Sequence, residues 1–336
     1  MNYARSIASQ GTVSSADISS PASWLRAARD LSAMDEAEAA FLAGAALQAL
    51  DGLIRDEPDW AGVWRGRMAL KAAAVSSSLF GRTEEEAALR DAVCLTRPGS
   101  DPGPAGRNLL AWRRLARHMG TPDRNLLNAI AESFGLKSEQ DFAEIAGQVR
   151  VLVQSGRPGP FAAVEAAESI ARATDSVEGR GLSVSAELLG FWLADLVLAA
   201  RSKWPNPVPL LATQAQKPFF RAGANRRRLR IGEEGWRRAC LIAYAQAALE
   251  AYDAAADIAR RAERLKVVAP KLRAKGSARI VEALLQDDAL LPSACIGAFP
   301  GMAMTDRALR RLFERLVSLE AVRELTGRAT FRLYGL

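Results

Sequence analysis

KLRAKGSARIVEALLQDDALLPSACIGAFPGMAMTDRALRRLFERLVSLEAVRELTGRATFRLYGL, residues 271–336, is the stretch that decides the fold assigned to this chain. Apolar residues recur in it at helical spacing three times, and two short β-prone segments follow around a glycine turn. Three helices followed by a hairpin are the order of a winged helix, a helix-turn-helix variant, so we predict a winged-helix-like module with a small β-hairpin. The predicted elements are helices over Lys271–Asp287, Leu290–Ala298 and Thr305–Glu320, a break at Pro300-Gly301, and strands over Val322–Thr326 and Thr330–Tyr334.

The third predicted helix is amphipathic. Its apolar residues form one stripe, and its arginines lie on the opposite face. In a helix-turn-helix, the helix after the turn lies in the major groove of DNA, so we predict that this face reads DNA. The residues predicted to contact DNA are Arg307, Arg310, Arg311 and Arg315 at the groove, with Arg323, Arg328 and Lys275 on phosphates.

The two predicted strands would form the wing. In the second strand apolar and polar residues alternate, Phe331 and Leu333 against Thr330, Arg332 and Tyr334. Arg328 lies at the predicted tip, within reach of a phosphate or the minor groove. A second interpretation stays open, because winged helices also bind proteins and basic solvated helix faces are common. From Thr305 to Leu336 there are seven Arg against four Asp and Glu, which is a modest excess.

Composition indicates a helical protein with a basic C-terminal part. Ala dominates the apolar residues and aromatic residues make up 7%, which favours closely packed helices over sheets, so the predicted class is predominantly all-α. Residues 217–336 hold 23 Lys and Arg against 13 Asp and Glu, whereas residues 1–216 hold 22 against 25. This asymmetry suits a polyanion-binding end attached to a neutral body, and it also fits an acidic protein partner.

The cysteines and the apolar segments indicate a compartment. Cys94, Cys240 and Cys295 are odd in number and widely spaced, as expected of reduced core thiols in a cytosolic protein. The N-terminus has no apolar segment behind a basic start, and the longest apolar run, Leu188–Ala200, is interrupted by Asp195 and is too short to cross a bilayer. We therefore expect a cytoplasmic protein with no membrane contact.

The chain divides into three predicted parts. Residues 1–21 are rich in Ser and Ala without periodicity, and we expect a disordered arm. Residues 22–270 are predicted to form an Ala-rich multi-helix domain, and residues 271–336 form the C-terminal module. Clear helices in the body are predicted over Ala37–Asp56, Trp60–Phe80 and Glu233–Val268.

The Pro- and Gly-rich loop 96–107 is the most distinctive segment of the body. Its prolines prevent a continuous helix, and its glycines permit tight turns before a new helix begins. A Gly-rich segment that opens a helix could bind phosphate, but the spacing fits neither the P-loop nor the dinucleotide fingerprint. We expect a rigid connector. If the loop is a ligand site, its polar members are Arg97, Asp101 and Arg107.

Three further features have structural interpretations. We expect Asp195, inside an apolar helix, to pair with an arginine rather than to be catalytic. The basic segment Lys217–Trp236 could hold phosphates but is more typical of a solvated loop. His118 is the one histidine of the sequence, and we expect it at a helix end.

Signatures of catalysis and metal binding are missing from the sequence. It contains no CxxC, HExxH, GxSxG or P-loop motif, and a single histidine leaves little for a Ser-His or Cys-His system. We therefore name no catalytic residues, no metal site and no cofactor. An enzyme is the less favoured class, although Asp, Glu, Arg and Tyr can do chemistry.

Several stretches resemble one known family. They are Glu85–Asp91, Thr96–Arg107 with Trp112-Arg113, Val268–Gly276, and Arg323–Arg328 with Thr330–Leu336. They are similar to an alphaproteobacterial family catalogued as domain of unknown function 1403. The similarity covers nearly the whole chain after the N-terminal arm. It implies a bacterial cytosolic origin and brings no assigned activity or catalytic residues.

Two classes of function follow. The first is a DNA-binding protein, such as a transcriptional or replicon-associated regulator, that contacts double-stranded DNA through the C-terminal module. A homodimer is one form that this protein could take. The second is a helical adaptor whose C-terminal module docks a protein. A small-ligand sensor or an enzyme that uses loop 96–107 is a third option.

Overall fold

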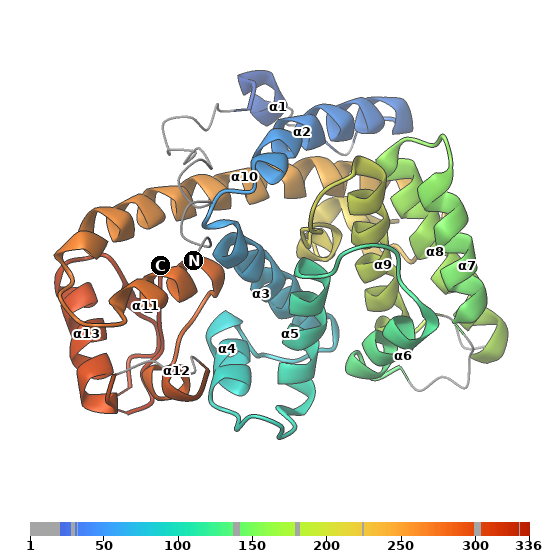
Figure 1. The fold of residues 1–336 in the computed structure, drawn as a ribbon. Helices are drawn as coiled ribbons and strands as arrows, with labels where there is room; N and C mark the ends of the chain where they lie inside the picture. The colour runs from blue at the N-terminus through green and yellow to red at the C-terminus, as the bar shows by residue number, and fades with distance from the viewer. Residues whose placement is uncertain are drawn as a thin grey trace.

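The computed structural model describes residues 21–27, 31, 33–136, 142–178, 182–223, 225–298, 304–328 and 330–336. The predicted arm and the Pro300-Gly301 break therefore lie outside the described residues, except for Pro21. Within them the chain is predominantly helical, as the sequence predicts (Figure 1). The helices are α1 (Ser23–Ala27), α2 (Glu36–Asp56), α3 (Ala61–Leu79), α4 (Glu86–Cys94), α5 (Gly103–Ala116), α6 (Arg124–Ser133), α7 (Ala143–Gln154), α8 (Gly159–Glu178), α9 (Val184–Ser202), α10 (Trp236–Val268), α11 (Ser277–Gln286), α12 (Pro292–Ala298) and α13 (Asp306–Ser318). Short 3-10 helices η1 (Leu211–Gln214), η2 (Pro218–Phe220) and η3 (Ala269–Lys271) and strands β1 (Arg221–Ala222), β2 (Arg227–Arg228), β3 (Arg323–Glu324) and β4 (Tyr334–Gly335) complete the set.

Local sequence explains where several helices begin. α2 starts with a capping box, in which Glu38 N–H donates to Asp35 Oδ1 over 2.8 Å and Asp35 N–H donates to the Glu38 carboxylate over 2.9 Å. These bonds satisfy two donors that the first turn leaves free. Ser183 caps α9 in the simpler way, through its hydroxyl. The three body helices named from the sequence are confirmed to within three residues at each end.

α10 is the helix on which the rest of the molecule is built. It is 33 residues long and runs the length of the molecule along one side, with α2 lying on it and α3, α8 and η1 also in contact (Figure 1). Its inner faces are lined largely by alanines, which let neighbouring helix axes approach closely. α10 therefore spans the body and ends at Val268, from which η3 and a turn lead to α11.

Buried tryptophans connect the helices of the body. The indole N–H of Trp64 on α3 donates to the Ala251 carbonyl of α10 over 2.9 Å, and that of Trp192 on α9 donates to the Ala111 carbonyl of α5 over 3.0 Å. Both rings are almost fully buried. A buried indole needs such an acceptor, so these bonds fix the position of α3 along α10 and of α9 along α5.

Asp195 corrects one of the predictions. Its carboxylate is fully buried on α9, and none of the arginines that the structure describes pairs with it. It accepts hydrogen bonds from the backbone N–H groups of Leu210, over 2.7 Å, and Leu211, over 3.2 Å. These donors stand at the start of η1, where backbone N–H groups lack partners within the helix. Burial raises the pKa of Asp195 to about 7 even though both hydrogen bonds favour the ionised form.

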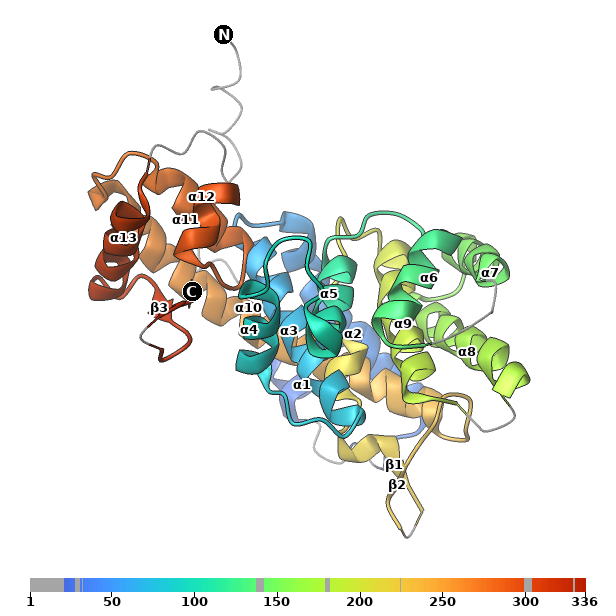
Figure 2. The same cartoon turned by 90° about the horizontal axis from the view of Figure 1, so that it is seen from below.

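The C-terminal residues form a compact arrangement of α11, α12, α13 and the β3–β4 hairpin, at one end of the molecule (Figures 1 and 2). β3 and β4 are antiparallel, with Arg323 opposite Gly335 and Glu324 opposite Tyr334. Leu290, between α11 and α12, adds a third antiparallel partner through two hydrogen bonds of 2.7 and 2.9 Å with the backbone of Tyr334. The first predicted helix is shorter than expected, because η3 and a turn occupy its beginning.

Charged groups tie these C-terminal elements to α4 and α5. Asp288, whose side chain is 3% exposed, accepts from Arg113 over 2.6 Å and from Arg90 over 3.4 Å. One residue earlier, Asp287 forms an exposed pair with Arg117 over 2.5 Å. The hydrophobic core is also continuous from the body into α11 and α13. Whether residues 271–336 fold as a domain of their own stays a prediction.

Two global features bear on compartment. Among the described residues, α2 alone is long and apolar enough to cross a bilayer, a test that core helices of soluble proteins also pass, and eight of its residues are buried in the protein. The three cysteines are free thiols, with Cys240 and Cys295 buried and Cys94 partly so, as the sequence predicts. Burial raises the pKa of Cys295 to about 11, which keeps that thiol protonated and unreactive.

Candidate nucleic-acid interface

α13 presents the basic surface that the sequence predicts. Thr305 caps the helix by accepting from Ala308 N–H over 3.2 Å, and Asp306 lies favourably in the first turn. The apolar stripe faces inward, where the Phe313 ring stacks on that of Tyr334 with 4.7 Å between centroids. The helix is therefore held by its apolar face, and its arginines point to solvent.

All seven residues predicted to contact DNA have exposed side chains. They are Arg307, Arg310, Arg311 and Arg315 on α13, Arg323 on β3, Arg328 in the wing and Lys275 just before α11. α13 lies at the outer edge of the molecule, far from α6 to α9 (Figures 1 and 2). Arg310 pairs with Asp306 over 2.7 Å but remains 68% exposed, so this pair leaves the guanidinium open to another partner.

The wing is the loop between β3 and β4, residues 325–333, and one carboxylate organises its start. Glu324 accepts from the backbone N–H groups of Thr326, over 2.8 Å, and Gly327, over 2.9 Å, and also from the Thr326 hydroxyl. Burial opposes ionisation of Glu324, but these hydrogen bonds outweigh it and lower its pKa. Arg332 Nε donates to the Arg328 carbonyl over 2.9 Å and so ties the two sides of the loop together.

The predicted second strand of the wing, Thr330–Tyr334, is wrong except at its last residue. Regular pairing covers Tyr334–Gly335, and residues 330–333 lie outside any strand. Phe331 has φ of +54°, which is incompatible with extended backbone, and its side chain is 66% exposed. Leu333 is buried as the alternation predicts. The pattern therefore failed at Phe331, where the backbone turns its ring outward.

Arg328 has a partner that the sequence did not suggest. It forms an ion pair over 2.5 Å with Asp91 of α4, 237 positions earlier, while its side chain stays 52% exposed. The pair attaches the wing to the body. A phosphate contact by Arg328 would have to compete with Asp91 or share the guanidinium with it.

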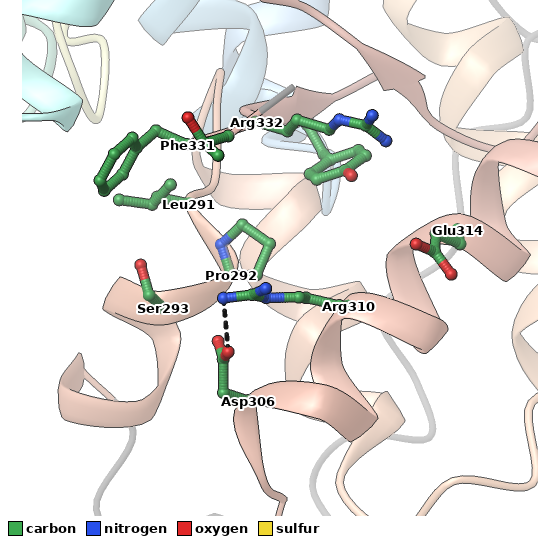
Figure 3. A pocket seen from close by; sticks show the side chains of 10 residues that line it. Leu291, Pro292, Ser293, Asp306, Arg310, Glu314, Phe331 and Arg332 are labelled. Carbon is green, nitrogen blue, oxygen red and sulfur yellow. Dashed lines mark ion pairs between the residues drawn. The ribbon is translucent and has the colours of Figure 1, made fainter. Parts of the chain in front are cut away.

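A cavity of about 400 Å³ lies between α12, α13 and the wing (Figure 3). Leu291 and Pro292 line it together with Phe331, and Arg310 and Arg332 supply positive charge. The carboxylates of Asp306 and Glu314 line it as well, so its walls combine apolar and charged surface. Sequence reasoning missed this cavity because its walls come from three separate segments, and no local pattern marks them.

Loop 96–107 has the geometry of a connector. Asp101 accepts from Gly103 N–H over 3.0 Å at the start of α5 and forms an ion pair with Arg107 over 2.6 Å. Arg97 is exposed, and the two paired side chains also face solvent. These contacts pair Asp101 with Arg107 inside the loop. The idea of a ligand site at Arg97, Asp101 and Arg107 stays a prediction.

The other candidates have structural roles. The basic segment after Lys217 forms the small β1–β2 hairpin, in which Arg228 pairs with the buried Glu187 and Arg227 pairs with Glu233 over 2.8 Å. His118 follows the end of α5, as predicted, and burial lowers its pKa. Within the described residues no cluster of His, Cys, Asp and Glu could hold a metal ion.

A family model described as "Protein of unknown function (DUF1403)" matches residues 10–336. The chain therefore belongs to this family, which agrees with the resemblance noted in the sequence. No curated protein matches the sequence. The alphaproteobacterial origin that the resemblance implies stays a prediction.

Proposed function

We propose that this member of the DUF1403 family binds double-stranded DNA through residues 271–336, with α13 in the major groove. The observation that carries the proposal is the solvent-facing row of four arginines on α13, a helix fixed to the protein by its apolar face. Guanidinium groups make bidentate hydrogen bonds to phosphate and to the O6 and N7 atoms of guanine. Such a row suits both non-specific and sequence-specific contact.

The order of the elements supports a winged-helix assignment for this part of the chain. Leu290, β4 and β3 lie side by side as antiparallel partners, with Leu290 placed between the first two helices and the hairpin after the third. A winged helix has this connectivity. The assignment predicts that α12 and α13 act as the helix-turn-helix pair and that the wing approaches the adjacent groove or backbone.

The proposed role is that of a transcriptional or replicon-associated regulator in a bacterial cytoplasm. Free, largely buried thiols suit a reducing compartment. A homodimer would present two such helices to successive turns of DNA, and we include dimerisation as part of the proposal.

Fluorescence anisotropy of labelled duplex DNA across a salt series tests the proposal. Each phosphate contact contributes about −0.9 to the slope of log K against log salt. The triple variant Arg310/Arg311/Arg315→Ala should therefore lower the steepness by roughly 2 to 3 and weaken binding at least tenfold. A matched control, Arg150/Arg157/Arg260→Ala, removes the same charge from exposed positions outside the module. Equal slopes for wild type and the α13 variant would refute the proposal.

A protein-docking role for the same module is the second candidate. Ile296 on α12 is 42% exposed, and Phe331 is also exposed, so apolar surface accompanies the charge. If the full-length protein binds no DNA at low salt, this adaptor function becomes the better explanation. Cross-linking from a cysteine placed at Ile296 would then capture a partner protein.

A further inference from the structure

Phe331 is a side chain that the fold turns away from its core. Its φ of +54° lies in the left-handed region, which bulky residues rarely adopt without a functional or steric reason. The neighbouring Leu333 is buried and Tyr334 lies in the sheet, so the core was within reach of this segment. A large apolar ring held in water on strained backbone indicates a binding role.

The loop around Phe331 is fixed by hydrogen bonds on both sides. Leu325 N–H donates to the Leu333 carbonyl over 2.8 Å, and Arg332 donates to the Arg328 carbonyl. The Arg328–Asp91 pair holds the same loop against α4. The ring is therefore presented from a supported loop, so less conformational entropy is lost when a ligand binds.

The surroundings of the ring define the chemistry of its ligand. Phe331, Arg310 and Arg332 all line the cavity of about 400 Å³, and the Phe331 ring and the Arg332 side chain point to opposite sides of it (Figure 3). An aromatic face beside cationic groups is the combination that binds a planar base with its phosphate. Asp306 and Glu314 can accept hydrogen bonds from base amino groups. Their negative charges would repel the phosphate groups of a second nucleic-acid strand.

We propose that Phe331 stacks on an unpaired nucleobase that enters this cavity, with phosphates of the same strand on Arg310 and Arg332. The proposal rests on the proposed DNA binding and adds that the module prefers junctions between duplex and single strand. In a continuous duplex both faces of every internal base are already stacked, so the ring could stack on a base only if the free-energy cost of unstacking that base were met first. At a fork or an overhang the base is free.

The experiment compares two DNAs of the same sequence, one fully paired and one forked, with 2-aminopurine at the first unpaired position. Stacking on an aromatic ring is worth about 1–3 kcal/mol per base, which corresponds to a preference for the fork of about 5- to 150-fold. The wild-type protein should show this preference and change the 2-aminopurine fluorescence. Phe331→Ala should lose both effects, and its affinity for the forked DNA should fall by more than its affinity for the paired duplex. Phe331→Trp should retain them.

Three controls and outcomes make the test decisive. Val267→Ala removes another exposed apolar side chain and should change nothing. Phe331→Gly removes the ring and relieves the positive φ, so loss of fork preference without loss of thermal stability would show that folding is not the cause. Equal affinity of wild type for both DNAs overturns this proposal and leaves duplex binding intact. Equal loss on both DNAs in Phe331→Ala also overturns it, and failure to bind either DNA overturns the proposed function itself.

Discussion

Asp288→Asn is the substitution whose effect the structure determines most directly. The Asp288 carboxylate lies between the guanidinium groups of the buried Arg90 and the partly buried Arg113, whose side chains are 7% and 15% exposed. Burial works against the charge of Arg113, but the interactions with Asp288 and Cys94 together outweigh it and raise the pKa of Arg113. An asparagine keeps the shape and removes the negative charge. Two buried cations would then face one another without compensation.

The expected cost follows from the burial. Breaking a buried ion pair by removing one partner destabilises a protein by about 3–5 kcal/mol, because the remaining charge cannot be solvated. The adjacent Asp287→Asn is a matched control, since it makes the same chemical change in the exposed pair with Arg117. Exposed pairs contribute about 0–1 kcal/mol. The two variants should therefore differ by at least about 2 kcal/mol.

Urea unfolding followed by circular dichroism measures this difference. With a slope of about 3 kcal/mol per M, the midpoint of Asp288→Asn should fall by about 1–1.7 M, and that of Asp287→Asn by no more than about 0.3 M. Adding Arg113→Met to Asp288→Asn should restore part of the loss, because one of the two stranded charges is removed. Equal midpoints for the two single variants would refute the reasoning that Asp288 compensates buried charge.

Two further predictions concern packing and pH. In Gly62→Ala the new Cβ would lie 2.2 Å from Gln286 Oε1 and 2.9 Å from the Gln286 backbone, so α11 must shift at a cost of about 1–3 kcal/mol. In the control Gly52→Ala the new Cβ meets nothing within 4 Å inside α2, so this variant should be more stable than wild type by about 0.5–1 kcal/mol. Thermal unfolding of both variants measures these changes. A rise in melting temperature for Gly62→Ala would contradict the close packing of α11 on α3. The pKa of Asp195 is raised to about 7 in the fold, so its contribution is fully present below the unfolded pKa near 3.9 and is lost as pH rises through 7. The free energy of unfolding of the wild type, relative to that of Asp195→Asn, should therefore fall by up to about 4 kcal/mol between pH 4 and pH 8, and parallel pH profiles would show that Asp195 does not titrate in this range.

Much of the candidate site was predictable because it is encoded locally. The inward stripe and outward arginines of α13 follow from residues three and four positions apart, and helix geometry alone converts that spacing into two faces. The Thr305 cap is local in the same sense. Phe331 shows the limit. Its alternation with Leu333 predicts a strand, but the turn made by the wing loop and the pairing of Tyr334 with Leu290 leave it at positive φ.

The sequence by itself determined the helical class, the bounds of the long helices, the family and the basic character of the C-terminal part. These properties depend on composition and on spacing within a few turns of chain, where covalent geometry fixes the distances between side chains. Only the tertiary structure decided that Asp288 would lie between Arg90 and Arg113 and that Arg328 would pair with Asp91. It also decided that Asp195 would accept hydrogen bonds from backbone N–H groups rather than pair with an arginine. Those partners stand 15 to 237 positions apart, and which of many possible partners a buried charge meets is set by how the helices pack.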